Sequence, residues 1–467
     1  MSSQQRNLRK SKFVILLMTF ELTKEFIENL ENAIESKDEV SLQVVLQDLY
    51  PADIATILYE INGEQAHYLF SLVDTPTGAE ILSHIEADDR KKFIKEQFTV
   101  EEVAKYVNLL DSDDAVDLLN EESIEVREKV IALLDDREQA RFIIDLMHYP
   151  EDVAGGLMQK ELIKVNLDWN VSDCVEEIRR QAENVEKVYS VYVVDDEQYL
   201  KGIVSLKQII LARKNTKVEN IYNDDIVFVE TTRPAEEVAE MMQRYDLETI
   251  PVVNTLGRLL GRITIDDVVD FITDKAEEDI QVMAGITGEA EEDDSVWKLS
   301  KARLPWLVVG VIGSLLAATV IKSFESELAK MASLALFIPI MGSTGGNVGI
   351  QTSSLIVQSL AEKTGISTSL GQRLFKIVLV ALVNGLIIGA LAGGYVYLIG
   401  EPLLFWVVCF SLLSVVILAS FMGTVTPLLL DKAGINPAIA SGPFITTAND
   451  IIGITTYFTI AHLLLRI

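Results

Sequence analysis

IPIMGSTGGNVGIQTSSL, residues 338–355, is the stretch that decides the fold of this chain. The segments around it, MASLALF and IVQSL, are typical of a helix that faces lipid. Its centre nevertheless holds four glycines, Asn347 and several hydroxyls. Polar or non-helical backbone at membrane depth is tolerated only where it is buried in protein or lines a wet cavity. We therefore expect Gly345 and Gly346 to free backbone carbonyls that face such a cavity and to let another helix approach closely.

Outward from this stretch, the chain divides into an acidic part and an apolar part. Residues 304–467 carry seven Lys and Arg against six Asp and Glu, a net charge of +1. Since the whole chain has a net charge of −30, residues 1–303 carry −31. Such acidity argues against nucleic acid as a partner and favours cations. The two cysteines, Cys174 and Cys409, lie in different parts and suit a reducing cytosol.

The apolar part is predicted to cross a lipid bilayer five times, since a span needs about 17–25 residues. The predicted spans are 304–320, 331–361, 377–399, 402–430 and 437–465. The Lys and Arg that flank these spans place residues 1–303 in the cytosol and the C-terminus outside, by the positive-inside rule.

Asp450, in SGPFITTANDIIGITTY, is the one acid inside a predicted span. A carboxylate at that depth is costly unless it faces a polar cavity, so Asp450 is a functional candidate. The second and fifth spans run in opposite directions and bring Asn347 and Asp450 near the same depth. Carboxylate, amide, hydroxyl and carbonyl oxygens are ligands that suit Mg²⁺. The simpler alternative for the glycines is close helix packing, and His462 is expected to serve packing or the membrane interface.

The first half of the acidic part is predicted to be all-helical. Residues 1–20 form an extension whose short apolar run indicates either a signal peptide or an upstream start codon, with translation beginning at Met18. Residues 21–150 show leucines and isoleucines at helical spacing. Similar helix starts recur at PADIATIL, TPTGAEIL, TVEEVAKYV and DSDDAVDLL. This repetition predicts a small superhelix of stacked helices.

Residues 151–275 change to two copies of a strand–helix–strand–strand–helix pattern. In each copy a β-branched strand meets a turn, and a glycine-led strand then leads into the last helix, as in VYVVDDEQYLKGIVS and IPVVNTLGRLLGRIT. The tandem resembles a pair of CBS domains, 151–212 and 213–275, which implies an α+β fold. Residues 276–303 form a connector whose end, from Ser295, is predicted to be an amphipathic helix.

The resemblance to CBS pairs also implies a candidate nucleotide site. Such pairs often bind adenine nucleotides through a Gly-x-x-Ser/Thr-x-x-Asp pattern, and GRITIDD matches it with Gly261, Thr264 and Asp267. The first copy, GIVSLKQ, has Gln208 in place of the acid. ATP is therefore an open candidate as a cofactor, with one site per subunit.

The membrane motifs carry a second resemblance. PIMGSTGGNVGIQ and NPAIASGPFITTANDIIG, with the order of helical domain, CBS pair, linker helix and five spans, resemble the MgtE magnesium channel family over nearly the whole chain. The resemblance implies a homodimer whose pore lies on the two-fold axis, lined by the second and fifth spans of both subunits. It also implies that Asp450 binds a hydrated Mg²⁺ and that Asn347 and Thr446 help to line the path.

The acidic residues suggest how such a pore is closed. In a Mg²⁺-poor cytosol they repel one another, and divalent ions that bridge them favour a compact state. By resemblance these positions match the family's magnesium sensor, which holds the linker (plug) helices against the pore. The candidates are Asp113, Asp117, Asp246, Asp267, Asp270, Glu278 and Asp279. Lys275 and Asn436 stand where the family can have acids, which leaves fewer sensor ions as an alternative.

The sequence as a whole predicts a multidomain membrane protein that is not an enzyme. Its parts are an all-α superhelical N domain (21–150), the α+β CBS pair (151–275), a linker or plug helix (276–303) and a five-helix transmembrane domain (304–467). We expect a homodimeric Mg²⁺ channel of the bacterial inner membrane that is closed by cytosolic Mg²⁺. A transporter of Co²⁺, Ni²⁺ or Mn²⁺ and a metal or nucleotide sensor without transport remain alternatives. An intramembrane aspartyl protease would need a second membrane carboxylate beside Asp450.

Overall fold

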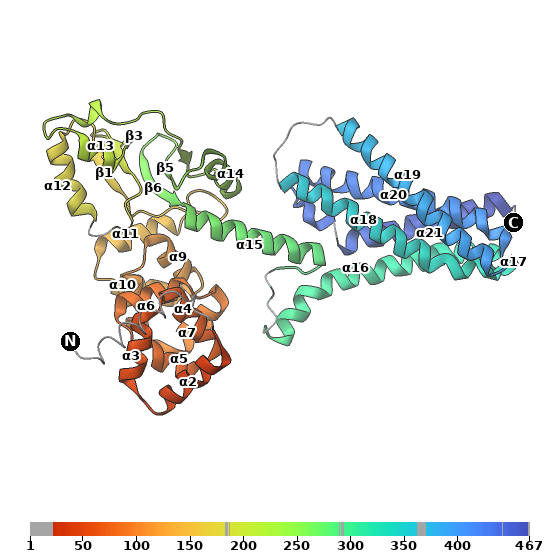
Figure 1. The fold of residues 1–467 in the computed structure, drawn as a ribbon, viewed down its shortest axis with the longest axis horizontal. Helices are drawn as coiled ribbons and strands as arrows, with labels where there is room; N and C mark the ends of the chain where they lie inside the picture. The colour runs from red at the N-terminus through yellow and green to blue at the C-terminus, as the bar shows by residue number, and fades with distance from the viewer. Residues whose placement is uncertain are drawn as a thin grey trace, which may run out of the picture. The chain divides into compact units, whose positions relative to one another are not determined.

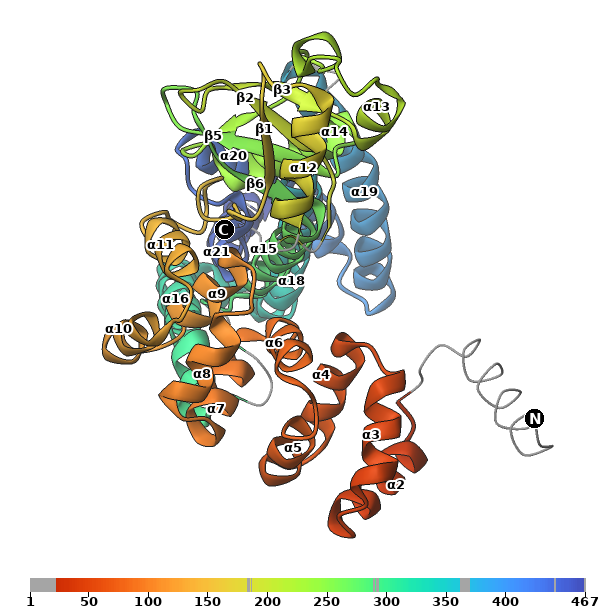
Figure 2. The ribbon, with the colours of Figure 1, turned by 90° about the vertical axis from the view of Figure 1, so that its left-hand side faces the viewer.

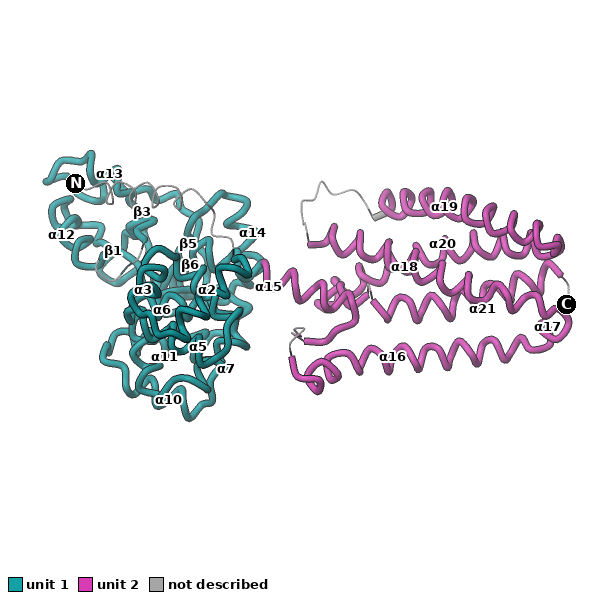
Figure 3. Tube along the Cα trace, turned by 60° about the horizontal axis from the view of Figure 1, so that its bottom comes forward, with its two compact units in different colours: residues 1–272 teal, residues 273–467 magenta. Residues whose placement is uncertain are grey.

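A computed structural model of the chain describes residues 22–182, 185, 187–288, 290, 294–361, 370–440 and 442–465. The chain forms two units, Met1–Ile272 and Thr273–Ile467, which Figure 3 draws in different colours. The expected N-terminal extension with Met18, and the flanking charges Lys363 and Arg466, lie outside the described residues.

The first part of unit 1 is helical, as the sequence predicted (Figure 1). Capping boxes at Asn62–Gln65 and Thr99–Glu102 satisfy backbone N–H groups at two helix starts. The helices pack on one another through a core that includes a cluster of edge-to-face rings around Phe70. The helices are α2 (Lys24–Glu35), α3 (Glu39–Asp48), α4 (Pro51–Glu60), α5 (Gly63–Phe70), α6 (Thr75–Ser83), α7 (Ala87–Gln97), α8 (Val100–Val107), α9 (Ser112–Asn120), α10 (Ile124–Leu133) and α11 (Arg137–Leu146).

The second part of unit 1 holds the two predicted repeats, which form two three-stranded sheets (Figure 2). In each sheet the first two strands are parallel and the last two antiparallel, because a helix crosses over between the first two. The first repeat contains β1 (Ile163–Asn166), α12 (Val171–Gln181), β2 (Val191–Val194), β3 (Leu200–Val204) and α13 (Leu206–Leu211), followed by η2 (Val218–Asn220). The second contains β4 (Val229–Glu230), α14 (Ala235–Tyr245), β5 (Thr249–Val253), β6 (Leu259–Thr264) and α15 (Ile265–Ala284).

The connector between the CBS pair and the spans differs from the expected one. The helix α15, which closes the second repeat, continues to Ala284. The helix expected from Ser295 is present, with Ser295 as its N-cap, but it runs without interruption into the first span as α16 (Val296–Ser323). Pro305 lies inside this helix and is the residue that would be expected to end or kink it, yet the helix continues through it into the apolar segment.

Unit 2 contains five helical segments that are long and apolar enough to cross a membrane, at the predicted positions. After α16 come α17 (Glu325–Lys330), η3 (Ala332–Phe337), α18 (Ile338–Ala361), α19 (Leu370–Leu398), α20 (Pro402–Lys432), η4 (Pro437–Ala440) and α21 (Pro443–Leu465). The central helix is α20, which packs against α18, α19 and α21.

The stretch 338–355 corrects one expectation. It lies within α18, which is a continuous helix from Ile338 to Ala361, so the glycines do not break the helix or free its carbonyls. They instead bring helices together: a Cβ on Gly349 would stand 2.0 Å from Asn449 Nδ2, and one on Gly423 would stand 2.6 Å from the Gly349 carbonyl oxygen. Close packing is therefore the main structural role of these glycines.

Candidate functional site

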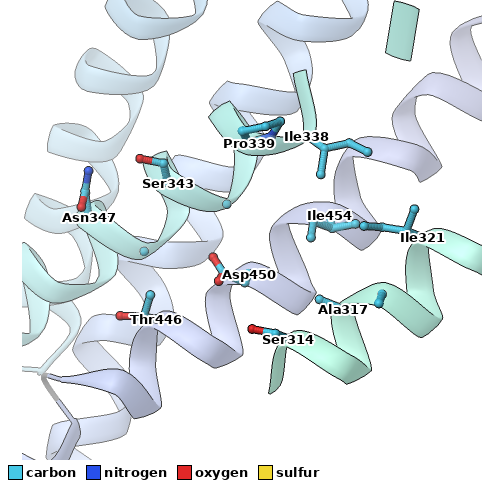
Figure 4. A pocket seen from close by; sticks show the side chains of 13 residues that line it. Ser314, Ala317, Ile321, Ile338, Pro339, Ser343, Asn347, Thr446, Asp450 and Ile454 are labelled. Carbon is cyan, nitrogen blue, oxygen red and sulfur yellow. The ribbon is translucent and has the colours of Figure 1, made fainter. Parts of the chain in front are cut away.

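A cavity of about 400 Å³ lies among α16, α18 and α21 in unit 2 (Figure 4). Asp450 is the one acid that lines it, and the other polar side chains carry hydroxyl or amide groups. The lining polar residues are Ser314, Ser343, Asn347, Thr446 and Asp450. The structure thus brings together Asn347 of the second predicted span and Thr446 and Asp450 of the fifth.

Asp450 lies where α18 leaves room for a carboxylate. A Cβ on Gly342 would stand 3.1 Å from Asp450 Oδ1, and a Cβ on Gly346 would stand 3.0 Å from Thr446 Cγ2. Any larger residue at either position would press on the polar side of α21. The α18 glycines on this face therefore shape the cavity beside the acid.

Gly345 lies on a different face of α18 from Gly346. A Cβ on Gly345 would meet Val415 of α20 and the Asn449 backbone of α21, and Gly345 does not line the cavity. Asn449, next to Asp450, is 2% exposed and points into the same packed region, where its side-chain N and O have no hydrogen-bond partner among the described residues. Of the two expected glycines, Gly346 alone faces the cavity.

The ligand chemistry of the cavity is that of oxygen. Among the described residues, no three His, Cys, Asp or Glu side chains are grouped so as to hold a metal ion. The described residues that line the cavity offer one carboxylate with hydroxyls and an amide, and none of them carries sulfur or imidazole. Such a set suits a hard cation that keeps most of its water.

A second polar site lies in unit 1, where the N domain meets the second repeat. Asp113 of α9 is 9% exposed; its Oδ2 accepts a hydrogen bond from Gln159 Nε2 at 3.2 Å, and its buried Oδ1 has no hydrogen-bond partner in the part of the chain that the structure describes. Burial, and then the charge of Asp267, raises the pKa of Asp113 well above its usual range. The same two causes raise the pKa of Asp114 to about 7. Burial also raises the pKa of Asp267 to about 6.

These carboxylates form a site for positive charge. Two of the predicted sensor residues, Asp113 and Asp267, are close enough for their charges to interact, although 154 positions of sequence separate them. Asp114, which sequence reasoning missed, belongs to the same group. Like charges in a buried place favour bound protons, which agrees with the raised pKa values of these three carboxylates.

Two further predicted sensor residues act on this group from its edge: after burial, the charge of Asp117 is among the causes that raise the pKa of Asp114, and that of Asp270 among those that raise the pKa of Asp267. Asp117, Asp246 and Asp270 are exposed. Asp246 ends α14 in a left-handed conformation (φ 55°), which acidic and amide residues tolerate better than most others. In unit 2, Glu278 pairs with Lys275 at 2.7 Å, and Asp279 Oδ1 accepts a hydrogen bond from Asn436 Nδ2 at 2.8 Å.

The residues of the predicted nucleotide motif already make contacts within the protein. A Cβ on Gly261 would stand 2.6 Å from the Gln159 carbonyl oxygen, so this glycine admits the chain that leads into the first repeat. Thr264 is 2% exposed and its hydroxyl donates to Asp267 Oδ2. Asp267 therefore links the motif to the acidic site.

Sequence reasoning also missed Gln159, Ser314 and Ser343. Gln159 is 5% exposed, accepts from the buried Arg262 Nε at 2.9 Å and donates to Asp113. A glutamine between two domains carries no local signal of such a role. Ser314 and Ser343 each interrupt an apolar segment, which is the signal that identified Asn347.

Comparison with known proteins agrees with this architecture. Family models match residues 338–460 (divalent cation transporter), 49–152 (MgtE intracellular N domain), and 152–215 and 218–274 (CBS domain). The magnesium transporter MgtE of Thermus thermophilus is 34% identical over 446 residues, which cover 94% of this chain and 98% of that protein. The magnesium transporter MgtE of Bacillus subtilis is 29% identical, over 91% of this chain and 97% of that one.

A solved structure gives the same result for the first half of the chain. The cytosolic domain of the Mg²⁺ channel MgtE in complex with ATP is 33% identical, with a TM-score of 0.50, and the match covers 52% of this chain and 99% of that one. The match to the Thermus protein extends through the membrane helices as well. The chain therefore belongs to the MgtE family of divalent cation transporters.

Proposed function

We propose that this protein is a Mg²⁺ channel that admits the ion through the cavity beside Asp450. The observation that carries the proposal is the cavity itself, in which one carboxylate stands among hydroxyls and an amide. A largely hydrated Mg²⁺ needs few direct ligands, and it needs hydrogen-bond acceptors for its waters. The names of the Thermus and Bacillus relatives support Mg²⁺ as the transported ion.

The channel is a homodimer in the bacterial inner membrane, with residues 1–303 in the cytosol and the C-terminus outside. Because one chain offers one membrane carboxylate, two chains that face each other would present a pair to the ion. The membrane potential drives the influx, since moving two charges inward is worth about 4.6 kcal/mol per 100 mV. No energy-coupling site is required for this direction of transport.

Cytosolic Mg²⁺ closes the channel by binding at the acidic site of unit 1. Asp113 is buried, and Asp114 and Asp267 are half-buried and close enough for their charges to interact. An ion there joins the N domain to the second CBS repeat and shifts the protein towards its compact, closed state. The exposed acids Asp117, Asp246 and Asp270 are secondary candidates for this role, whereas Glu278 and Asp279 are each paired within unit 2.

ATP is proposed as a ligand of the CBS pair, with Gly261, Thr264 and Asp267 at its site. The ATP complex of the related cytosolic domain supports this assignment. Because Asp267 belongs to both sets, nucleotide and Mg²⁺ would influence each other's affinity.

The test of the pore is Mg²⁺ uptake into liposomes that contain the purified protein. Asp450→Asn keeps the size of the side chain and removes its charge, so uptake should fall at least tenfold. Asp431→Asn is the matched control, because Asp431 is exposed and does not line the cavity, and its uptake should equal that of the wild type. Wild-type uptake by Asp450→Asn would refute the pore assignment. Parallel assays with Co²⁺, Ni²⁺ and Mn²⁺ test the rival ions.

A further inference from the structure

The end of α15 is held against the membrane domain by a hydrogen bond between an amide and a carboxylate. Asn436 Nδ2 donates to Asp279 Oδ1 at 2.8 Å, and both residues belong to unit 2. The oxygen of the same amide also forms a hydrogen bond, because Asn436 Oδ1 accepts one from the backbone N–H of Ala438 at 2.8 Å. The backbone N–H requires an acceptor, so this second bond fixes the NH₂ group on the side of Asp279.

The packing beside this bond leaves little space between α15 and the start of α21. A Cβ on Gly442 would stand 2.6 Å from the Met283 carbonyl oxygen, and one on Gly285 would stand 2.7 Å from Pro443 Cγ. Gly285 also has a φ of +79°, which favours glycine. The Asp279–Asn436 bond therefore lies next to a close contact with the helix that carries Thr446 and Asp450.

The carboxylate of Asp279 needs no cation in this arrangement. An amide NH₂ is a neutral donor, whereas an acid at position 436 would face Asp279 as a second carboxylate. Two such carboxylates repel unless a proton or a cation lies between them. The nearby Glu278 is likewise paired, with Lys275 at 2.7 Å.

We infer that Asn436 is a positioning residue that holds α15 on the membrane domain without a metal ion. Binding of Mg²⁺ then acts on closure through the acids of unit 1, and this contact persists when the ion is absent. Asn436→Asp would turn the same contact into one that requires a divalent cation. The inference deepens the proposed closure by cytosolic Mg²⁺ and rests on it for its functional meaning.

The test is hydrogen–deuterium exchange of the full-length protein in detergent, with EDTA or with millimolar Mg²⁺. In the wild type, the segments 277–285 and 435–440 should be equally protected in both conditions. In Asn436→Asp, their exchange in EDTA should be roughly tenfold faster and Mg²⁺ should restore protection, since two facing carboxylates repel until a cation lies between them. The control is Asp431→Asn, which changes a nearby exposed acid outside this contact.

A second variant separates the contact from general damage. The exchanged pair Asp279→Asn with Asn436→Asp rebuilds one amide and one carboxylate, so it should be protected in EDTA as the wild type is. Mg²⁺-independent protection of Asn436→Asp would overturn the inference, and so would loss of protection of the wild type in EDTA. The readout requires no ion conduction, so its failure is distinct from failure of the proposed channel function.

Discussion

At the scale of single residues, Gly342 determines the space beside Asp450. A Cβ at this position would stand 3.1 Å from Asp450 Oδ1, which is closer than most real contacts of that atom. We expect Gly342→Ala to displace the carboxylate and to lower Mg²⁺ uptake several-fold while the protein still folds. Gly310→Ala is the matched control, because nothing lies within 4 Å of a Cβ there. Equal uptake by the two variants would show that this glycine does not shape the path.

Gln159 is a buried residue whose hydrogen bonds should contribute to the stability of unit 1. Its side chain lies between the buried Arg262 and the buried Asp113 and bonds to both. Gln159→Met keeps the shape and removes the bonds to Arg262 Nε and Asp113 Oδ2, so the free energy of unfolding should fall by about 1–3 kcal/mol. Thermal unfolding in EDTA measures this loss. The exposed Gln243→Met is the control, and a loss of the same size there would contradict the explanation.

At the scale of elements, the contact of α9 with α15 should depend on pH. The pKa values of Asp114 and Asp267 rise from 3.8 to about 7 and about 6 on folding, so the native state binds more protons than the unfolded state between these values. The contribution of these two carboxylates to stability is therefore fully present below about pH 4 and is lost as the pH rises through 6 and 7. In EDTA we expect the melting temperature of unit 1 to drop by about 3–5 °C between pH 5 and pH 7.5.

Millimolar Mg²⁺ at pH 7.5 should reverse that drop, because the cation replaces the lost protons. Asp114→Asn should flatten the pH dependence, and Asp224→Asn, an exposed acid elsewhere in unit 1, should leave it unchanged. A melting temperature that rises with pH in the wild type would show that burial does not disfavour the charged form of these carboxylates. The measurement follows the unfolding of the full chain by circular dichroism.

The elements also show how far the sequence could be interpreted. The spans and the two repeats were predicted because apolar length and β-branched alternation are local signals. The position at which α15 ends and the continuity of α16 were not predicted, since helix ends depend on capping residues and on packing. Asp450 was recognisable alone as an acid in a span. Asp114 and Gln159 were not, because their burial arises only where α9 meets the segment before the first repeat.

At the scale of the whole molecule, one chain supplies a single membrane carboxylate, so the proposed pore requires two chains. Light scattering of the detergent-solubilised protein should give a protein mass of twice 51.9 kDa. Co-expression of wild-type and Asp450→Asn chains with different affinity tags allows mixed dimers to be purified. Their Mg²⁺ uptake should fall well below half of the wild-type rate, because both carboxylates of one pore face the same ion.

The control for this experiment is a mixed dimer of wild-type and Asp431→Asn chains, which should transport as the wild type does. A rate of half in the Asp450 mixed dimers would indicate instead that each chain conducts through its own cavity. Each chain has a cavity among α16, α18 and α21, so this outcome is a physical alternative. The mixed dimer thus distinguishes one shared pore from two independent ones, which the mass of the assembly alone does not.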